Sequence, residues 1–303
     1  MHDHHSGHHH PIPDSGSAIA WAFFLNFGFT IIEFIGGYLT NSTAIMADAI
    51  HDLGDSLAIG LSWVLNRISK KPHNEAFSYG YRRFTLLGSI INGTILIIGS
   101  IWIFTESIPR LFNPQMPMVE GMIGLAILGT IVNGYAAYKL SNGKTLADRM
   151  LNLHLLEDVL GWVAVLVVAI ILYFFDWPIL DPILSIGFTL FILLNVGKTL
   201  YKTIRVFLQA TPDTEEYREL ENRIRSIPNI KDVHHFHIWS LDGARNVLSA
   251  HVVIHSEIGI QRQRELKATI QACLSEYDFE HTTIELEFLE QGCRDEPAQP
   301  HSH

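Results

Sequence analysis

The sequence predicts an all-α membrane domain, a bundle of six spanning helices, followed by a small α+β domain of ferredoxin-like type. Three observations support this fold class. Only 17% of the 303 residues are charged, against about 25% in an average soluble domain. Six apolar stretches are each long enough to cross a bilayer, which takes about 20 residues. Beyond Lys198 the apolar stretches end and charged residues concentrate.

The six expected spans differ in how apolar they are. The second and fifth are the least apolar, because both carry ionisable residues in mid-span. The first is too long for a cleaved signal peptide and follows a segment without Lys or Arg, so we expect it to remain as a span. The spans are expected at residues 18–39, 43–65, 84–107, 119–140, 150–175 and 179–200.

Basic residues in the connecting loops predict the orientation. Loop 67–83 holds five Lys or Arg residues and loop 139–149 holds three, whereas the alternate loops hold one at most. By the positive-inside rule, the basic loops and both chain termini face the cytoplasm. We therefore expect a multi-pass protein of the cell (inner) membrane.

The segment after residue 207 predicts the element order α-β-β-α-β, a small ferredoxin-like sandwich that lacks one strand. A start signal at Pro212 and Asp213 precedes the first helix, and the turn LDGAR separates two strands. The expected elements are a helix at 215–227, strands at 230–241 and 246–255, a helix at 261–277 and a strand at 282–289. The expected divisions are a His-rich cytoplasmic tail (1–16), a transmembrane domain (17–207), a cytoplasmic domain (208–290) and a C-terminal tail (291–303).

Composition excludes one class of partner and suggests another. The net charge of −10 argues against nucleic acid, because phosphate binding needs a basic face. Cys273 and Cys293 are expected to be reduced thiols in cytosolic sequence. Six of the first ten residues are His, a composition typical of metal binding. An expression tag is the alternative, although tags are usually uninterrupted.

Two expected spans carry the same pair of polar residues. His51 precedes Asp55 by four positions, and His154 precedes Asp158 by four. On a helix, residues at this spacing lie on one face. Asp48 lies near the same stripe as His51, whereas Asp52 is rotated away by about 100°.

The energetic cost of these pairs points to a bound cation. Each ionised carboxylate near the bilayer centre costs about 2.5–3.5 kcal/mol on insertion scales, and the spans hold no Lys or Arg near mid-depth. Two imidazole nitrogens and two carboxylate oxygens make a tetrahedral set that suits Zn²⁺. Cd²⁺ remains open, and Mn²⁺ or Mg²⁺ is less expected. The alternative is that these polar groups join helices by hydrogen bonds.

Several phrases of the sequence, together with the paired H-x-x-x-D motifs, resemble the cation diffusion facilitator family. They are NFGFTIIEFIGG, YGYRRF, ESIPRLFNP, LDPILS and VHHFHIW. The resemblance covers nearly the whole chain and is closest to bacterial zinc and cadmium exporters. It departs from the family pattern at Thr85, where many members have Glu.

The resemblance implies a homodimer in the lipid bilayer that is a secondary transporter and not an enzyme. It implies efflux of Zn²⁺, and of Cd²⁺ as a second substrate, from the cytoplasm in exchange for protons by alternating access. The implied transport site consists of His51, Asp55, His154 and Asp158.

The soluble domain contains a second group of candidate ligands. By resemblance, His234, His251 and Glu285 match positions that bind cytoplasmic zinc, a regulatory ligand that could bring two soluble domains together. Strand alternation would place His235 and His237 on one face and His234 on the other. The alternative is that these histidines pack and hydrogen-bond within the sheet.

Three other functions remain open. An intramembrane metalloenzyme would need an open metal position and a general base, and the sequence has no H-E-x-x-H. A membrane-bound metal sensor or store would not need a buried site on two spans. A passive channel differs from an antiporter only in proton coupling.

Some polar residues are expected to be structural or supporting. Asn26, Glu33 and Asn133 could support the metal site or join helices. Glu106 and Arg110 are spaced for an ion pair at a helix end. Asp181 is expected to cap the sixth span rather than bind metal.

Overall fold

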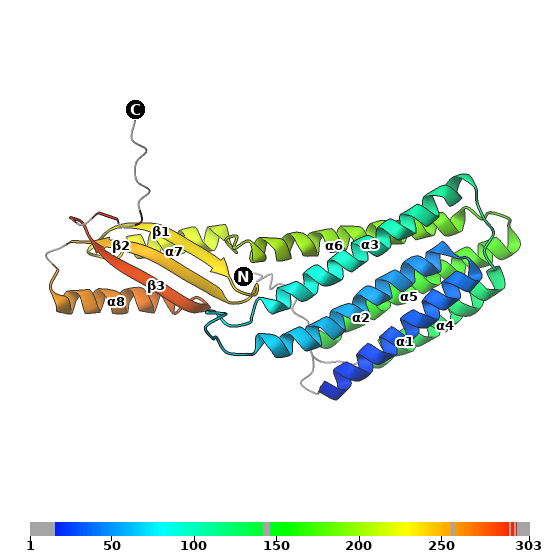
Figure 1. The fold of residues 1–303 in the computed structure, drawn as a ribbon, viewed down its shortest axis with the longest axis horizontal. Helices are drawn as coiled ribbons and strands as arrows, with labels where there is room; N and C mark the ends of the chain where they lie inside the picture. The colour runs from blue at the N-terminus through cyan, green and yellow to red at the C-terminus, as the bar shows by residue number, and fades with distance from the viewer. Residues whose placement is uncertain (1–15, 142–145, 256–257, 291, 294, 296–303) are drawn as a thin grey trace, which may run out of the picture. The chain divides into compact units, whose positions relative to one another are not determined.

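The apolar stretches of the sequence form six long helices, as predicted (Figure 1). The computed structural model of the chain describes residues 16–141, 146–255, 258–290, 292–293 and 295. The chain divides into two units, with the boundary between Lys202 and Thr203. The long helices are α1 (Gly16–Thr40), α2 (Thr43–Ser69), α3 (Phe84–Phe112), α4 (Val119–Leu140), α5 (Leu146–Phe174) and α6 (Leu180–Phe207).

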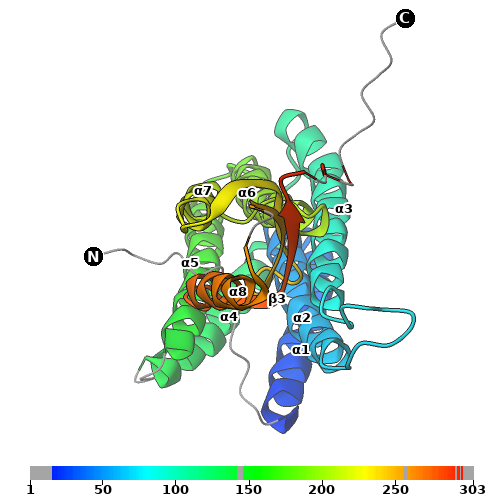
Figure 2. The same ribbon diagram turned by 90° about the vertical axis from the view of Figure 1, so that its left-hand side faces the viewer.

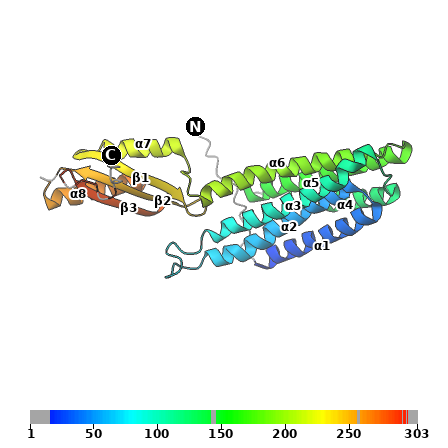
Figure 3. The ribbon, with the colours of Figure 1, turned by 45° about the horizontal axis from the view of Figure 1, so that its top comes forward.

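Helix α2 differs from the other five in composition and lies inside the bundle. All except α2 are long and apolar enough to cross a membrane, and α2 carries Asp48, Asp52 and Asp55 in its first half. It lies between α1 and α3 (Figures 1 and 3) and also contacts α5. Asp48 and Asp52 of α2 are buried in this position, and intramembrane carboxylates are tolerated where protein encloses them.

Two apolar cores flank α2. One joins the start of α2 to α4 and α5 around the fully buried Trp162, and the other joins α2 to α3 and α6 around Ile103. Close approach of α4 and α5 depends on Gly129, since a Cβ at that position would overlap the Trp162 indole. Small residues serve the same purpose in other membrane helix contacts.

Asp181 anchors the beginning of α2 to α6. Its side chain is 2% exposed and accepts hydrogen bonds from the Thr43 backbone N–H and hydroxyl, both at 2.8 Å, and from the Ser42 hydroxyl. The first N–H groups of a helix lack partners within the helix and attract negative charge. Asp181 therefore caps the start of α2. The sequence suggested instead that it caps α6, the helix on which it lies.

Arg110 makes a related contact at the turn between α1 and α2. Its guanidinium donates to the Asn41 backbone oxygen at 2.8 Å and to the Asn41 side-chain oxygen at 2.9 Å. Asn41 has a φ of 54°, a conformation that Asn adopts more readily than most residues. The expected pair of Arg110 with Glu106 is present at 3.8 Å.

The second unit has the predicted order α-β-β-α-β. Strands β1 and β2 pair antiparallel, β2 and β3 pair parallel, and the sheet order is β1-β2-β3. Helices α7 and α8 share one apolar core with the sheet and lie on the same side of it (Figure 2). The elements are α7 (Thr214–Arg225), β1 (Ile230–Ser240), β2 (Asn246–Ile254), α8 (Ile260–Leu274) and β3 (Phe279–Phe288).

Removal of the Asp181 carboxylate should destabilise the membrane unit. We expect Asp181→Ala to cost about 2–3 kcal/mol, because buried donors at the start of α2 lose a charged acceptor. The measurement is the apparent melting temperature of the full chain in detergent. Glu106→Ala is the control, since an exposed ion pair contributes about 0–1 kcal/mol. Equal melting temperatures for the two variants would contradict the anchor.

Candidate metal centres

The two H-x-x-x-D pairs face each other across the contact between α2 and α5. The Nε2 atom of His154 lies 3.1 Å from Oδ2 of Asp55, and Nε2 of His51 lies 3.7 Å from the same oxygen. Asp158 lies 3.9 Å from each imidazole. One donor atom from each of the four residues lies within 4.8 Å of the others.

This spacing suits a single tetrahedral ion. Zinc ligands lie about 2.0–2.2 Å from the metal, which separates neighbouring donors by roughly 3.4 Å in a tetrahedron. The separations of 3.1–3.9 Å need only small side-chain adjustments to reach that geometry. Asp158 is the most enclosed of the four, with 10% of its side chain exposed, whereas His154 is 32% exposed.

Other polar residues of α1 lie close to this group. The Asn26 amide donates to the Ser56 hydroxyl at 2.9 Å and to the Asp52 backbone oxygen at 3.3 Å. Asn26 therefore joins α1 to α2 by hydrogen bonds, which is one of the two roles that the sequence left open for it.

Asn133 lies on α4, and its side-chain nitrogen has no hydrogen-bond partner among the described residues.

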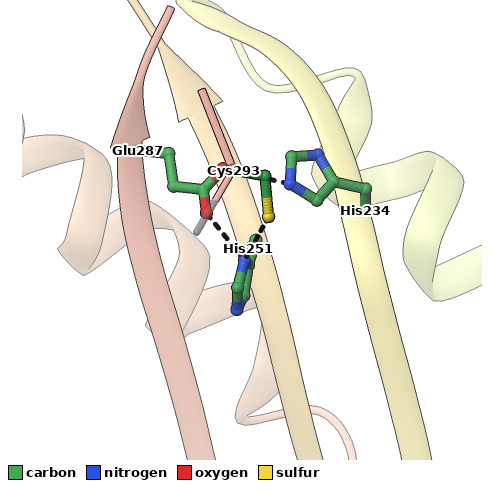
Figure 4. Close-up of side chains that lie close together, drawn as sticks. All are labelled: His234, His251, Glu287 and Cys293. Atoms are coloured by element: carbon green, nitrogen blue, oxygen red, sulfur yellow. Dashed lines mark hydrogen bonds and ion pairs between the residues drawn. The ribbon is translucent and has the colours of Figure 1, made fainter. Parts of the chain in front are cut away.

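The second unit brings together four donors from three strands and the segment after β3 (Figure 4). Glu287 is central: its Oε1 lies 2.7 Å from Nδ1 of His251, and its Oε2 lies 3.0 Å from Nε2 of His234. The sulfur of Cys293 lies 3.5 Å from Nδ1 of His251. One donor atom of each residue lies within 4.8 Å of the others.

Glu285, the carboxylate expected from the sequence, lies at the edge of this group. It pairs in register with His251, and its Oε2 lies 3.8 Å from Nε2, the ring nitrogen that faces away from Glu287. Its side chain is 40% exposed, whereas that of Glu287 is 9% exposed. The enclosed carboxylate is therefore Glu287, whereas the resemblance to the family pointed to Glu285. Both residues lie on one strand face, so sequence alone could not choose between them.

The prediction that His234 and His235 face opposite sides of the sheet is wrong. The pairing of β1 with β2 is irregular between His234 and His237, and His235 has a φ of 48°. A bulge of this kind breaks the alternation of side chains. The ring centre of His235 consequently lies 5.0 Å from that of His251 and 5.3 Å from that of His234.

Cys293 was not predicted as a ligand. Cys273 and Cys293 are both free thiols, as expected. Burial raises the pKa of the Cys293 thiol, and the neighbouring carboxylates of Glu287 and Asp295 raise it further. A metal ion must therefore displace a proton from this thiol in order to bind its sulfur. The His-rich N-terminal tract and the last three residues lie outside the described residues.

Comparisons with known proteins agree with this architecture. Residues 19–208 match the model of the cation efflux transmembrane domain, and residues 212–288 match that of the cation efflux protein cytoplasmic domain. The chain is 31% identical to the cadmium, cobalt and zinc/H⁺–K⁺ antiporter of Bacillus subtilis, over 93% of this chain and 92% of that protein. It is 31% identical to the zinc transporter ZitB of Escherichia coli, over 99% and 97% of the two chains.

A third relative is the metal cation efflux system protein CzcD of Cupriavidus metallidurans. It is 30% identical over 98% of this chain and 94% of that protein. Two family models together cover most of the chain, and the relatives are matched over nearly their whole length. The chain therefore belongs to the cation efflux family, the cation diffusion facilitators, and is a membrane transporter of divalent metal cations rather than an enzyme.

Proposed function

We propose that the protein exports Zn²⁺, and also Cd²⁺, from the cytoplasm in exchange for protons by alternating access. The observation that carries this proposal is the convergence of two H-x-x-x-D pairs from α2 and α5 on one small volume. In this proposal the ion is held by His51, Asp55, His154 and Asp158.

Charge balance supports a divalent cargo at these residues. Residues 43–66 and 152–174 contain no Lys or Arg, so the chain offers no cationic side chain there to neutralise Asp55 and Asp158. A Zn²⁺ ion carries the two positive charges that match the two carboxylates, and imidazole with carboxylate ligands suits it. A catalytic zinc ion in a metalloenzyme keeps one coordination position open for water or substrate, whereas this group offers four protein donors.

Proton exchange follows from the chemistry of the ligands. Imidazole binds metal only when neutral, and its ordinary pKa is about 6.5, so protons compete with the metal ion. Protons that enter from the outer side would displace Zn²⁺ outward, and their release to the cytoplasm would restore the site. The relative from Bacillus subtilis is named a cadmium, cobalt and zinc/H⁺–K⁺ antiporter, and the H⁺ in that name supports a proton as a counter-ion here.

We also propose a homodimer in the inner membrane, with both termini and the second unit in the cytoplasm. The basic loops at 67–83 and 139–149 support this orientation. The proposed domain limits are 17–207 and 208–290, between tails at 1–16 and 291–303.

The transport site is tested by Asp158→Asn in proteoliposomes that contain a Zn²⁺ reporter and a pH reporter. We expect Zn²⁺ flux and the coupled proton flux to fall at least about 100-fold, since changes merely around metal ligands already cost 10–100-fold. Glu157→Gln is the matched control, because Glu157 is the exposed neighbour of Asp158 on α5. Normal flux in Asp158→Asn would contradict the site. Zn²⁺ flux without proton movement in the unmodified protein would instead indicate a channel.

We propose a second, regulatory metal site in the cytoplasmic unit. His234 and His251 provide two nitrogens, and Glu287 provides an enclosed carboxylate, with Glu285 beside His251 as a further acceptor. Cys293 adds a sulfur to the same volume, and sulfur favours softer metals such as Zn²⁺ and Cd²⁺ over hard ions. Because Cys293 follows β3, a bound ion would fasten the start of the C-terminal tail to the sheet.

The thiolate ligand has a spectroscopic signature that does not depend on transport. We expect the full chain loaded with Co²⁺ to show a sulfur-to-cobalt charge-transfer absorption that is lost in Cys293→Ser and kept in Cys273→Ser. The band should strengthen as pH rises, because the raised pKa of Cys293 keeps the thiol protonated at lower pH. A band that persists in Cys293→Ser, or is lost only in Cys273→Ser, would contradict Cys293 as a ligand.

A further inference from the structure

A buried carboxyl group on α1 faces another carboxyl group. Glu33 is 0% exposed, and among the described residues neither of its oxygens accepts a hydrogen bond from an N–H or hydroxyl group. An isolated ionised carboxylate in such a place would cost many kcal/mol, and groups in this situation bind a proton instead. Glu33 is not one of the residues assigned above to the metal.

Asp48 on α2 is in a similar position. It is 6% exposed, and its Oδ2 also lacks a partner among the described residues. Its other oxygen lies near the α5 backbone, since a Cβ built on Gly161 would lie 3.4 Å from Oδ1. Two buried carboxyl groups on neighbouring helices thus each have an oxygen without a hydrogen-bond donor among the described residues.

The ionisable groups that act on these two carboxyls are themselves acidic. The Glu33 carboxyl lies within hydrogen-bond reach of the Asp52 carboxyl, and the negative charges of Asp48 and Asp158 also act on it. Asp48 is influenced by Asp52, Asp158 and Asp55. No cationic group is among them, so neither carboxyl gains a neutralising side chain from α2 or α5.

A charge count separates these groups from the metal ligands. One divalent ion neutralises Asp55 and Asp158 and leaves Glu33, Asp48 and Asp52 uncompensated. Carboxylates that share an apolar site cannot all ionise. Because the described residues around them supply no cationic side chain, protons neutralise the remaining negative charge, and the positive charge of a bound metal ion favours their release.

A buried polar stripe on α1 continues from Glu33. Thr30 lies three residues before Glu33 and is 1% exposed, and Asn26 lies four residues before Thr30. This spacing puts the three side chains on one helix face. The Thr30 hydroxyl donates to the Asn26 backbone oxygen at 2.9 Å. Polar groups therefore extend from Glu33 toward the N-terminal end of α1.

We propose that Glu33 and Asp48 form a proton-binding site, separate from the metal ligands, that carries one of the protons exchanged for each metal ion. The proposal rests on the proton exchange proposed above. A carboxyl O–H bond forms on this pair when a proton enters from the outer side. The bond breaks when that proton leaves to the cytoplasm, so no other reactant is required.

The test uses Glu33→Gln in the full chain, because the amide has the shape of a protonated carboxyl but cannot release a proton. In proteoliposomes we expect Zn²⁺ flux to continue while the number of protons moved per Zn²⁺ falls by about one. Zn²⁺ affinity, measured by calorimetry in detergent, should change by less than about threefold. Glu120→Gln is the matched control, since Glu120 is exposed in the first turn of α4.

Infrared spectroscopy gives a readout that is independent of transport. The unmodified protein should show the C=O stretch of a protonated carboxylic acid, and Glu33→Gln should lose part of that band. An unchanged proton-to-zinc ratio in Glu33→Gln would overturn the proposal. If Glu33→Gln does not fold, the proton-to-zinc ratio is measured in Asp48→Asn instead, and an unchanged ratio there would overturn the proposal. Absence of the protonated-carboxyl band from the unmodified protein would also overturn it. Failure of the proposed function looks different, namely proton-independent Zn²⁺ flux in the unmodified protein.

Discussion

The cost of placing carboxylates in an apolar membrane interior governs the arrangement of this protein. Asp48, Asp52 and Asp55 make α2 too polar to face lipid, and α2 is the helix that lies between α1 and α3 and contacts α5. The large apolar side chains exposed on the other helices, such as Phe24 on α1 and Ile98 on α3, are suited to lipid contact. The bundle thus encloses the first half of its least apolar helix, the part that bears these aspartates.

The position of α2 explains how the proposed metal ligands meet. Two apolar cores hold α2 on opposite flanks, and the Gly129–Trp162 contact brings α4 close to α5. Because α2 and α5 are in contact, the pairs at His51 and His154 converge without any loop residue. Sites built on helices hold their geometry more firmly than sites built on loops.

Sequence periodicity alone was sufficient for the parts of this fold that repeat. The six long helices, the α-β-β-α-β order and the shared helix face of His51 and Asp55 all follow from spacing along a helix or strand. Features that depend on tertiary contact were out of reach. The bulge at His235, the choice of Glu287 over Glu285 and the position of Cys293 beside His251 depend on strand register and on how the chain returns after β3. Likewise, nothing in the sequence near Asp181 shows that its carboxylate oxygens accept hydrogen bonds from the first residues of α2.

The hydrogen bonds that Arg110 and Asp181 make with residues 41–43 restrict how the bundle can change shape. Arg110 from α3 holds Asn41, and Asp181 from α6 holds Ser42 and Thr43. The adjoining ends of α1, α2, α3 and α6 are thereby linked into one block. The opposite end of α2 leads through Lys70 into the loop before α3. A helix that is fixed at one end tilts about that end. We therefore expect the largest displacement of α2 at its C-terminal end, next to the basic loop.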